Sequence, residues 1–101
     1  DDIEFLDTIE QLRSQIDEVD NELLNILSKR MKLAENIGRY KKRNNIAILQ
    51  ADRWSEILEK TQAIGKLKGL SPEFIRTFLR AVHQESINHQ EDIMNEVEST
   101  K

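Results

Sequence analysis

The chain has 101 residues, of which 38% are hydrophobic and 34% charged, with a net charge of −4 and no Cys. This acidic balance argues against nucleic-acid or membrane partners held by bulk electrostatics, and an anionic ligand would need a local cluster of cations. Without Cys, with two His and with no apolar run near 18 residues, we expect no metal, no cofactor, no membrane span and a cytoplasmic location.

The first predicted element is a long helix from about Phe5 to Lys42, because apolar residues recur there at intervals of three and four. These residues are Ile9, Leu12, Ile16, Val19, Leu23, Ile26, Leu33 and Ile37. Such a helix would extend about 50 Å, beyond the diameter of a compact chain this short, whose radius of gyration is about 13 Å. The sequence therefore predicts a homodimer in which the helix lies along its copy.

Residues 43–45 form a polar break, in which Asn can adopt the left-handed conformation at a helix end. A shorter helix is predicted from Leu49 or Asp52 to Leu67, with two glycines, Gly65 and Gly69, bracketing its end.

The third helix is predicted to begin at Ser71, which caps it, with Pro72 in the first helical position and Glu73 at the positive end of the dipole. It runs to about Val97. The predicted fold is thus all-α, with a long, a short and a medium helix per chain in an intertwined homodimeric bundle. We expect one domain over residues 1–101, frayed at 1–6 and 97–101, and, since residue 1 is Asp, cut from a longer fused protein.

Cations interrupt the apolar stripe of the first helix. Arg30 occupies a position where the spacing calls for an apolar residue, and Lys41, eleven residues on, lies only about 20° away around the helix. Arg13 is about 100° off that face and is expected to reach a different site across the dimer. Since burying an unpaired cation costs several kcal/mol, such a cluster predicts an anion, most simply a small ligand with more than one carboxylate.

Polar residues also occupy the core faces of the other two helices, with Arg53 one turn before an apolar residue and Ser86 and Gln90 one turn apart. Taken singly, each has a simpler interpretation. A lone core Arg is more often a snorkelling side chain or a structural ion pair, and a core Ser or Gln is more often a satisfied polar group. In the same way, Trp54 fits packing better than substrate stacking, and His83 and His89 fit ordinary, partly exposed helix positions. The functional interpretation depends on several such residues on three helices.

Together these residues resemble a known family. The stretch LRSQIDEVDNELLNILSKRMKLAENIGRYKK is similar to the first helix of the all-helical chorismate mutases, which show Leu-Arg, an Ile-Asp-x-Asp-like segment, a Leu-rich run ending in Arg, and Gly-x-x-Lys. The similarity continues through Asp52-Arg53, Leu58, Gly65 and Leu70 into QESINHQ, so it covers residues 9–94. The motifs are short singly but quite specific in this order and spacing.

The resemblance implies a dimer with two equivalent sites that rearrange chorismate to prephenate in phenylalanine and tyrosine biosynthesis. In it, Arg30 and Arg53 match arginines that handle the substrate carboxylates, and Arg13 matches the one contributed across the dimer. Lys41 matches a lysine that contacts a carboxylate and the ether oxygen. Gln90 matches the residue that makes the second contact to that ether oxygen. Ser86 matches a serine that lines the carboxylate end of the site.

Two positions depart from the family pattern. Many relatives carry Glu, which meets the ring hydroxyl of the substrate, where this chain has Trp54, and often Asp where it has Gln50. The main chain near Gln50, or Glu56, is expected to substitute.

Two rival functions stay open. One is an isochorismate–pyruvate lyase of the same fold, against which Ser86 argues because that position is not generally Ser in the lyases. The other is a non-catalytic helical dimer that regulates a fused shikimate-pathway enzyme, for which the first enzyme of that pathway is the predicted partner.

Overall fold

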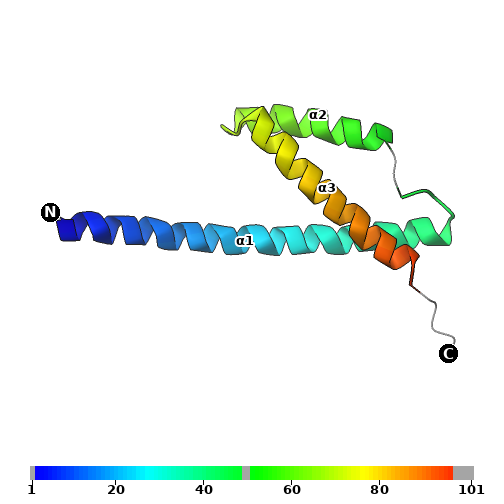
Figure 1. The fold of residues 1–101 in the computed structure, drawn as a ribbon, viewed down its shortest axis with the longest axis horizontal. Coiled ribbons are helices and arrows are strands. Elements are labelled where there is room, and N and C mark those ends of the chain that lie inside the picture. Colours follow the sequence, from blue (N-terminus) through cyan, green and yellow to red (C-terminus); the bar gives the residue numbers. More distant parts are fainter. Residues whose placement is uncertain (1, 49–50, 97–101) are drawn as a thin grey trace. The chain divides into compact units, whose positions relative to one another are not determined.

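The computed structural model describes residues 2–48 and 51–96, and these form three α-helices with no strand among them. Figure 1 shows α1 (Asp2–Arg43), α2 (Ala51–Leu67) and α3 (Pro72–Met94). The prediction of a long, a short and a medium helix is confirmed. α1 begins three residues earlier than expected and α3 ends at Met94, while Leu49 and Val97 lie outside the described residues.

The end of α1 follows the local rules read from the sequence. Asn45 takes a positive φ of 55°, and the Ile46 N–H donates to the Lys41 carbonyl over 2.9 Å. A left-handed residue followed by this bond is the usual way to satisfy the last carbonyls of a helix. The chain therefore leaves α1 in a fixed direction and folds back along the Lys41 side.

The turn between α2 and α3 is defined just as locally. Gly69 has φ 81°, and the Leu70 N–H bonds to the Gly65 carbonyl over 2.9 Å, so a left-handed glycine ends α2. Ser71 then caps α3 by accepting from the Phe74 N–H, and Pro72 opens the helix, both as predicted. This short connection lets α3 pack against α2.

The described helices belong to two compact units, one ending at Lys32 and the other starting at Leu33. The second unit has a small core in which α3 provides most of the buried apolar side chains: Ile75, Leu79, Val82 and Ile93, together with Ala34 of α1. Two polar residues of α3, Ser86 and Gln90, are buried in the same unit. The core thus already carries polar groups where a purely structural one would carry apolar residues.

The first unit presents the apolar stripe predicted for α1 to solvent. Its large side chains are between 43% and 62% exposed over five successive stripe positions, which are Leu12, Ile16, Val19, Leu23 and Ile26. In the described part of the chain, no helix is long and apolar enough to cross a membrane.

Candidate active site

Lys41, near the end of α1, and Gln90, on α3, meet in the second unit. The Lys41 Nζ donates to the Gln90 Oε1 over 3.2 Å and to the Ile48 carbonyl over 2.7 Å. Gln90 is buried and Lys41 is partly buried. The structure thus brings together two residues that the sequence proposed for one site, although they are 49 positions apart.

The Lys41 contact fixes which way the Gln90 amide points. An ammonium group can only donate, so the amide oxygen has to face Lys41. The amide nitrogen, with two N–H donors, is then the end of Gln90 that can serve another acceptor. Lys41 and Gln90 together therefore form a donor pair suited to an oxygen that gains negative charge.

Burial of Lys41 lowers the pKa of its ammonium group, because desolvation penalises the charged form. A ligand carboxylate at this position would act in the opposite sense and favour the charged form. The site therefore holds a cation whose charge a dicarboxylate ligand would stabilise.

Gly38 explains how α1 comes this close to Gln90. A Cβ on Gly38 would lie 3.2 Å from the Gln90 Cα and 3.3 Å from its Cγ, so any side chain there would push against α3. Gly38 is the glycine of the Gly-x-x-Lys motif, and its packing against α3 depends on how the two helices meet, which the motif alone does not reveal.

Ser86 lies one turn before Gln90 on α3 and is buried, with its hydroxyl donating to the Val82 carbonyl over 2.9 Å. This bond to the preceding turn is common for Ser in helices, and it agrees with the simpler interpretation of a satisfied core residue. Ser86 lies on the same face of α3 as Gln90, about 40° from it around the helix. A role at a ligand carboxylate stays a prediction.

Arg53 lies one turn before Ile57 on α2, and its role at a ligand carboxylate stays a prediction. Its side chain is 64% exposed and pairs with Glu56 at 3.6 Å. Around the helix Arg53 is about 100° from Trp54 and about 120° from Gly65, which places it at the edge of the packed face. Glu56, proposed as a substitute contact for a ring hydroxyl, is 69% exposed and engaged in the same pair.

The first unit contains the other two predicted arginines. Arg13 is 69% exposed and its Nη1 lies 2.9 Å from the Glu10 Oε1, one turn earlier on α1. Arg30 is partly buried, and desolvation lowers the pKa of its guanidinium group, although Arg stays charged in proteins. Gln50 lies outside the described residues.

Two features of the second unit escaped the sequence analysis. The Ile48 carbonyl accepts from Lys41, which no residue pattern announces because every residue carries a carbonyl. The rings of Trp54 on α2 and His83 on α3 stack, with centroids 4.2 Å apart and an interplanar angle of 23°. The packing role favoured for Trp54 is thus present, and its partner is His83.

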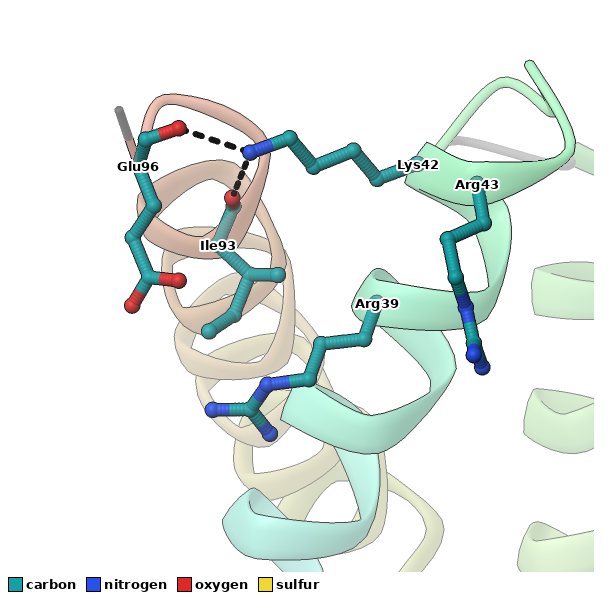
Figure 2. Close-up of a pocket in the computed structure, with 5 residues that line it drawn as sticks. All are labelled: Arg39, Lys42, Arg43, Ile93 and Glu96. Atoms are coloured by element: carbon teal, nitrogen blue, oxygen red, sulfur yellow. Dashed lines mark hydrogen bonds between the residues drawn. The ribbon is translucent and has the colours of Figure 1, made fainter. Parts of the chain in front are cut away.

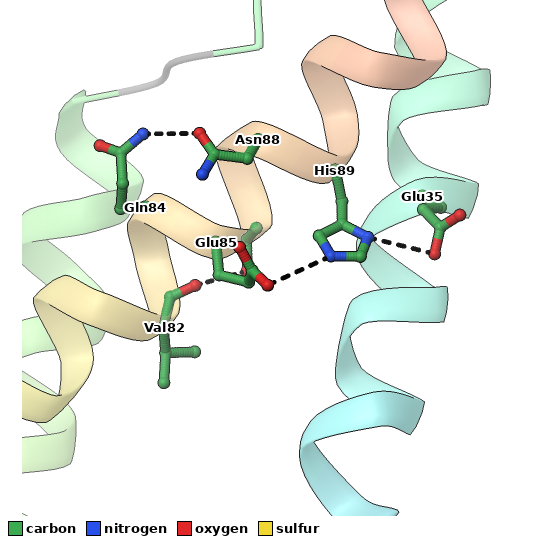
Figure 3. Close-up of polar contacts among 7 residues, drawn as sticks. Glu35, Val82, Gln84, Glu85, Asn88 and His89 are labelled. Carbon is green, nitrogen blue, oxygen red and sulfur yellow. Dashed lines mark hydrogen bonds and ion pairs between the residues drawn. The ribbon is translucent and has the colours of Figure 1, made fainter. Parts of the chain in front are cut away.

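The second histidine joins α3 to the end of α1. Figure 3 shows His89 between two carboxylates, with Glu35 of α1 at 3.4 Å from Nδ1 and Glu85 of α3 at 3.5 Å from Nε2. His89 directly precedes Gln90, but successive helix positions differ by about 100°, so the two side chains leave α3 on different sides. His89 contributes to helix packing beside the Lys41–Gln90 pair.

A cationic groove of about 290 Å³ lies at the same end of the second unit, lined by Arg39, Lys42, Arg43, Ile93 and Glu96. Figure 2 shows the Lys42 Nζ donating to two carbonyls at the end of α3, those of Ile93 at 3.3 Å and Glu96 at 2.7 Å. Lys42 therefore satisfies the C-terminus of α3, which favours a cation. Its direction differs from that of Lys41 by about 100° around α1, so the groove is separate from the candidate site.

The second unit thus defines an all-helical domain with a cation and an amide donor converging in a partly buried, polar site. The chain belongs to the family described as chorismate mutase type II, whose model matches residues 12–91. It is 35% identical to the T-protein of Enterobacter agglomerans over 81 residues, or 80% of this chain and 22% of that protein. It is also 32% identical to the bifunctional chorismate mutase/prephenate dehydratase of Buchnera aphidicola subsp. Schizaphis graminum over 83 residues.

A third similar protein, the bifunctional chorismate mutase/prephenate dehydratase of Aquifex aeolicus, is 38% identical over 61 residues, which are 60% of this chain and 17% of that protein. The Buchnera match covers 82% of this chain and 22% of its relative. The chain therefore spans only about a fifth of the length of these curated relatives. Family membership, predicted from the sequence, is confirmed.

Proposed function

We propose that the chain converts chorismate to prephenate, as an intramolecular isomerase without covalent, acid–base or cofactor chemistry. The observation that carries this proposal is the Lys41–Gln90 pair in a chain of this family. In the rearrangement, a carbon–oxygen bond breaks and negative charge grows on the ether oxygen. The Lys41 ammonium and the Gln90 amide N–H₂ stabilise that charge, and a preorganised, partly dry site makes such stabilisation large.

The substrate must also be held in a folded conformation. Arg30 and Arg53 bind its two carboxylates, and Ser86 lines the carboxylate end. Arginine suits this role because its planar fork grips a carboxylate through two parallel hydrogen bonds. Binding holds the reacting atoms near one another, so the entropy cost of bringing them together falls on the binding step. The activation free energy of the rearrangement is lower for that reason.

We propose that the site is completed by a second copy of the chain, with the partner's Arg13 reaching the carboxylate. Support comes from the exposed stripe of the first unit, where Leu12, Ile16 and Val19 are 50–59% exposed. Fully burying such a side chain stabilises by about 1.5–3 kcal/mol, so pairing two stripes would be strongly favourable. Sedimentation and concentration-dependent melting test the dimer, which a folded, active monomer at micromolar concentration would exclude.

The proposed activity is tested by following prephenate formation from chorismate, with isochorismate assayed in parallel for pyruvate release by the alternative lyase activity. Arg30→Ala should lower kcat/KM more than about 100-fold, because a charged clamp in a partly dry site is worth about 3 kcal/mol. Activity within a factor of two of wild type would remove Arg30 from the site.

Two relatives pair this domain with prephenate dehydratase by name, so a fused or associated enzyme of aromatic biosynthesis stays a prediction for this chain too.

A further inference from the structure

Lys41 is held at both of its ends by the segment that follows α1. Its main-chain carbonyl accepts from the Ile46 N–H over 2.9 Å, and its ammonium donates to the Ile48 carbonyl over 2.7 Å. Because both bonds close within a few residues of Lys41, the backbone of this segment and the Lys41 side chain fix one another. The position of the ammonium is therefore set by the loop as well as by Gln90.

The turn that brings this segment back along Lys41 is made at Asn45. Its φ of 55° lies in the left-handed region, which most residues with a Cβ avoid and which Gly and Asn adopt most readily. Beyond the turn, Ile46 and Ile48 are partly buried while Ala47 is exposed, the alternation of an extended segment with one side against the protein. A right-handed conformation at residue 45 would send the segment elsewhere and take the Ile48 carbonyl away from the ammonium.

A Lys side chain depends on such a contact for its aim. Its ammonium is a point charge on a flexible four-carbon stem, and fixing that stem costs rotamer entropy. The bond to the Ile48 carbonyl, at 2.7 Å, is shorter than the bond to the Gln90 amide oxygen, at 3.2 Å, so the loop provides the tighter of the two contacts. A donor held in this way stabilises developing charge better than one that must first be ordered.

We propose that Asn45 is a positioning residue of the candidate active site, because its left-handed turn places the Ile48 carbonyl where it holds the Lys41 ammonium beside Gln90. In this role Asn45 acts through Lys41. The inference rests on the proposed mutase activity and names the backbone turn on which the donor pair depends.

The first measurement is kcat and KM for chorismate in variants of residue 45. Asn45→Gly keeps the left-handed turn without steric cost and should stay within about twofold of wild type. Asn45→Val has a β-branched side chain that opposes this conformation. It should lower kcat about tenfold and raise KM less than about threefold, since a misplaced ammonium matters most for charge that develops during the reaction. Asn45→Ala, with a milder loss of kcat, replaces it if the Val variant folds poorly. Equal kcat for the Gly variant and the strained variants would overturn the proposal.

Gly69→Val is the matched control, because it strains the other left-handed turn, at φ 81°, where an added Cβ would have no atom of the described residues within 4 Å. It should lower the melting temperature and leave the kcat of the folded protein unchanged. Lys41→Met then shows through which residue Asn45 acts. Without the ammonium, adding Asn45→Val should lower kcat by less than about twofold, whereas a further tenfold loss would overturn the proposal.

Exchange of the Lys41 ammonium protons with water, followed by NMR, tests the contact independently of catalysis. The signal is identified by its loss in Lys41→Met. Exchange should be several-fold faster in Asn45→Val than in wild type, Asn45→Gly and Gly69→Val, and equal rates in all four proteins would overturn the proposal. Wild type inactive on chorismate would refute the proposed function, whereas the exchange rates would still decide whether Asn45 holds Lys41.

Discussion

The Lys41 ammonium donates to the Gln90 amide oxygen over 3.2 Å, linking the last turn of α1 to the C-terminal part of the buried face of α3. The contact is made by residues of the chain itself and holds the two donors beside each other. Preorganised donors stabilise developing charge more than flexible ones, because no reorganisation is needed at the moment the charge appears. The close approach of the helices at Gly38 is what keeps the distance short.

Gly38→Ala should therefore lower activity more than stability. The new Cβ would meet the Gln90 backbone at 3.2 Å, so α3 has to shift by a few tenths of an ångström and carry Gln90 with it. We expect kcat to fall about tenfold, since small misplacements at a reacting centre are costly. The free energy of unfolding should change by less than about 2 kcal/mol, because crowding opposes the better helix propensity of Ala.

Gly65→Ala is the matched control for that variant. Its Cβ would lie 2.7 Å from the Ile75 Cγ1, in the core away from the Lys41–Gln90 pair. It should lower the melting temperature while the folded fraction retains wild-type kcat. If both variants lose kcat to the same extent, the Gly38 contact has no special role at the site.

Lys42→Met should destabilise the protein without affecting turnover. Lys42 satisfies two carbonyls at the end of α3, and a cation there also interacts favourably with the helix dipole. We expect the free energy of unfolding to fall by about 1 kcal/mol in urea titrations. Arg43→Met, on an exposed neighbour in the same groove, should change it by less than about 0.5 kcal/mol. Equal midpoints for the two variants would contradict the capping role.

Complementation between two inactive variants tests where Arg13 acts. If Arg13 serves the partner's site, a mixed dimer of Arg13→Ala and Arg30→Ala chains has one site lacking both arginines and one site keeping both. Activity per mixed dimer should approach half of the wild-type value, while each variant alone stays nearly inactive. Fluorescent labels on the two chains would verify exchange, after which unchanged inactivity would place Arg13 in the site of its own chain.

The features predicted correctly from the sequence are those set by neighbouring residues. The left-handed Asn45 and the Ser71 cap depend on a few adjacent positions, and the structure has both. The stack of Trp54 on His83 depends on how α2 crosses α3, which no spacing within either helix encodes. The exposure of the Arg53 side chain could not be predicted from the sequence for a related reason. An apolar stripe has an edge, and the packing of the helix decides on which side of that edge a residue lies.

The identity of residue 90 determines how activity should depend on pH. The Gln90 amide donates without titrating, so wild-type kcat/KM should be nearly flat from about pH 6 to 9, with no acid–base bell. Activity should decline only at more alkaline pH, as Lys41 loses its proton. Burial lowers the pKa of Lys41 in the free enzyme, which is the state that kcat/KM reports, so this decline begins below the pH at which an ordinary Lys, with a pKa of about 10.4, would titrate.

Gln90→Glu should make the reaction strongly pH-dependent. A protonated carboxyl can donate to the ether oxygen, whereas an ionised one would repel its growing negative charge. Because the new carboxyl would lie beside the Lys41 ammonium, the ion pair lowers its pKa, and the neutral form persists only in acid. The variant should therefore approach wild-type kcat/KM only at low pH and lose about tenfold per pH unit above the pKa of the carboxyl. The measurement is kcat/KM against pH for both proteins. A steep single-proton dependence of the wild type near neutrality, or equal activity of the variant at pH 8, would show that Gln90 is not the donor to the ether oxygen.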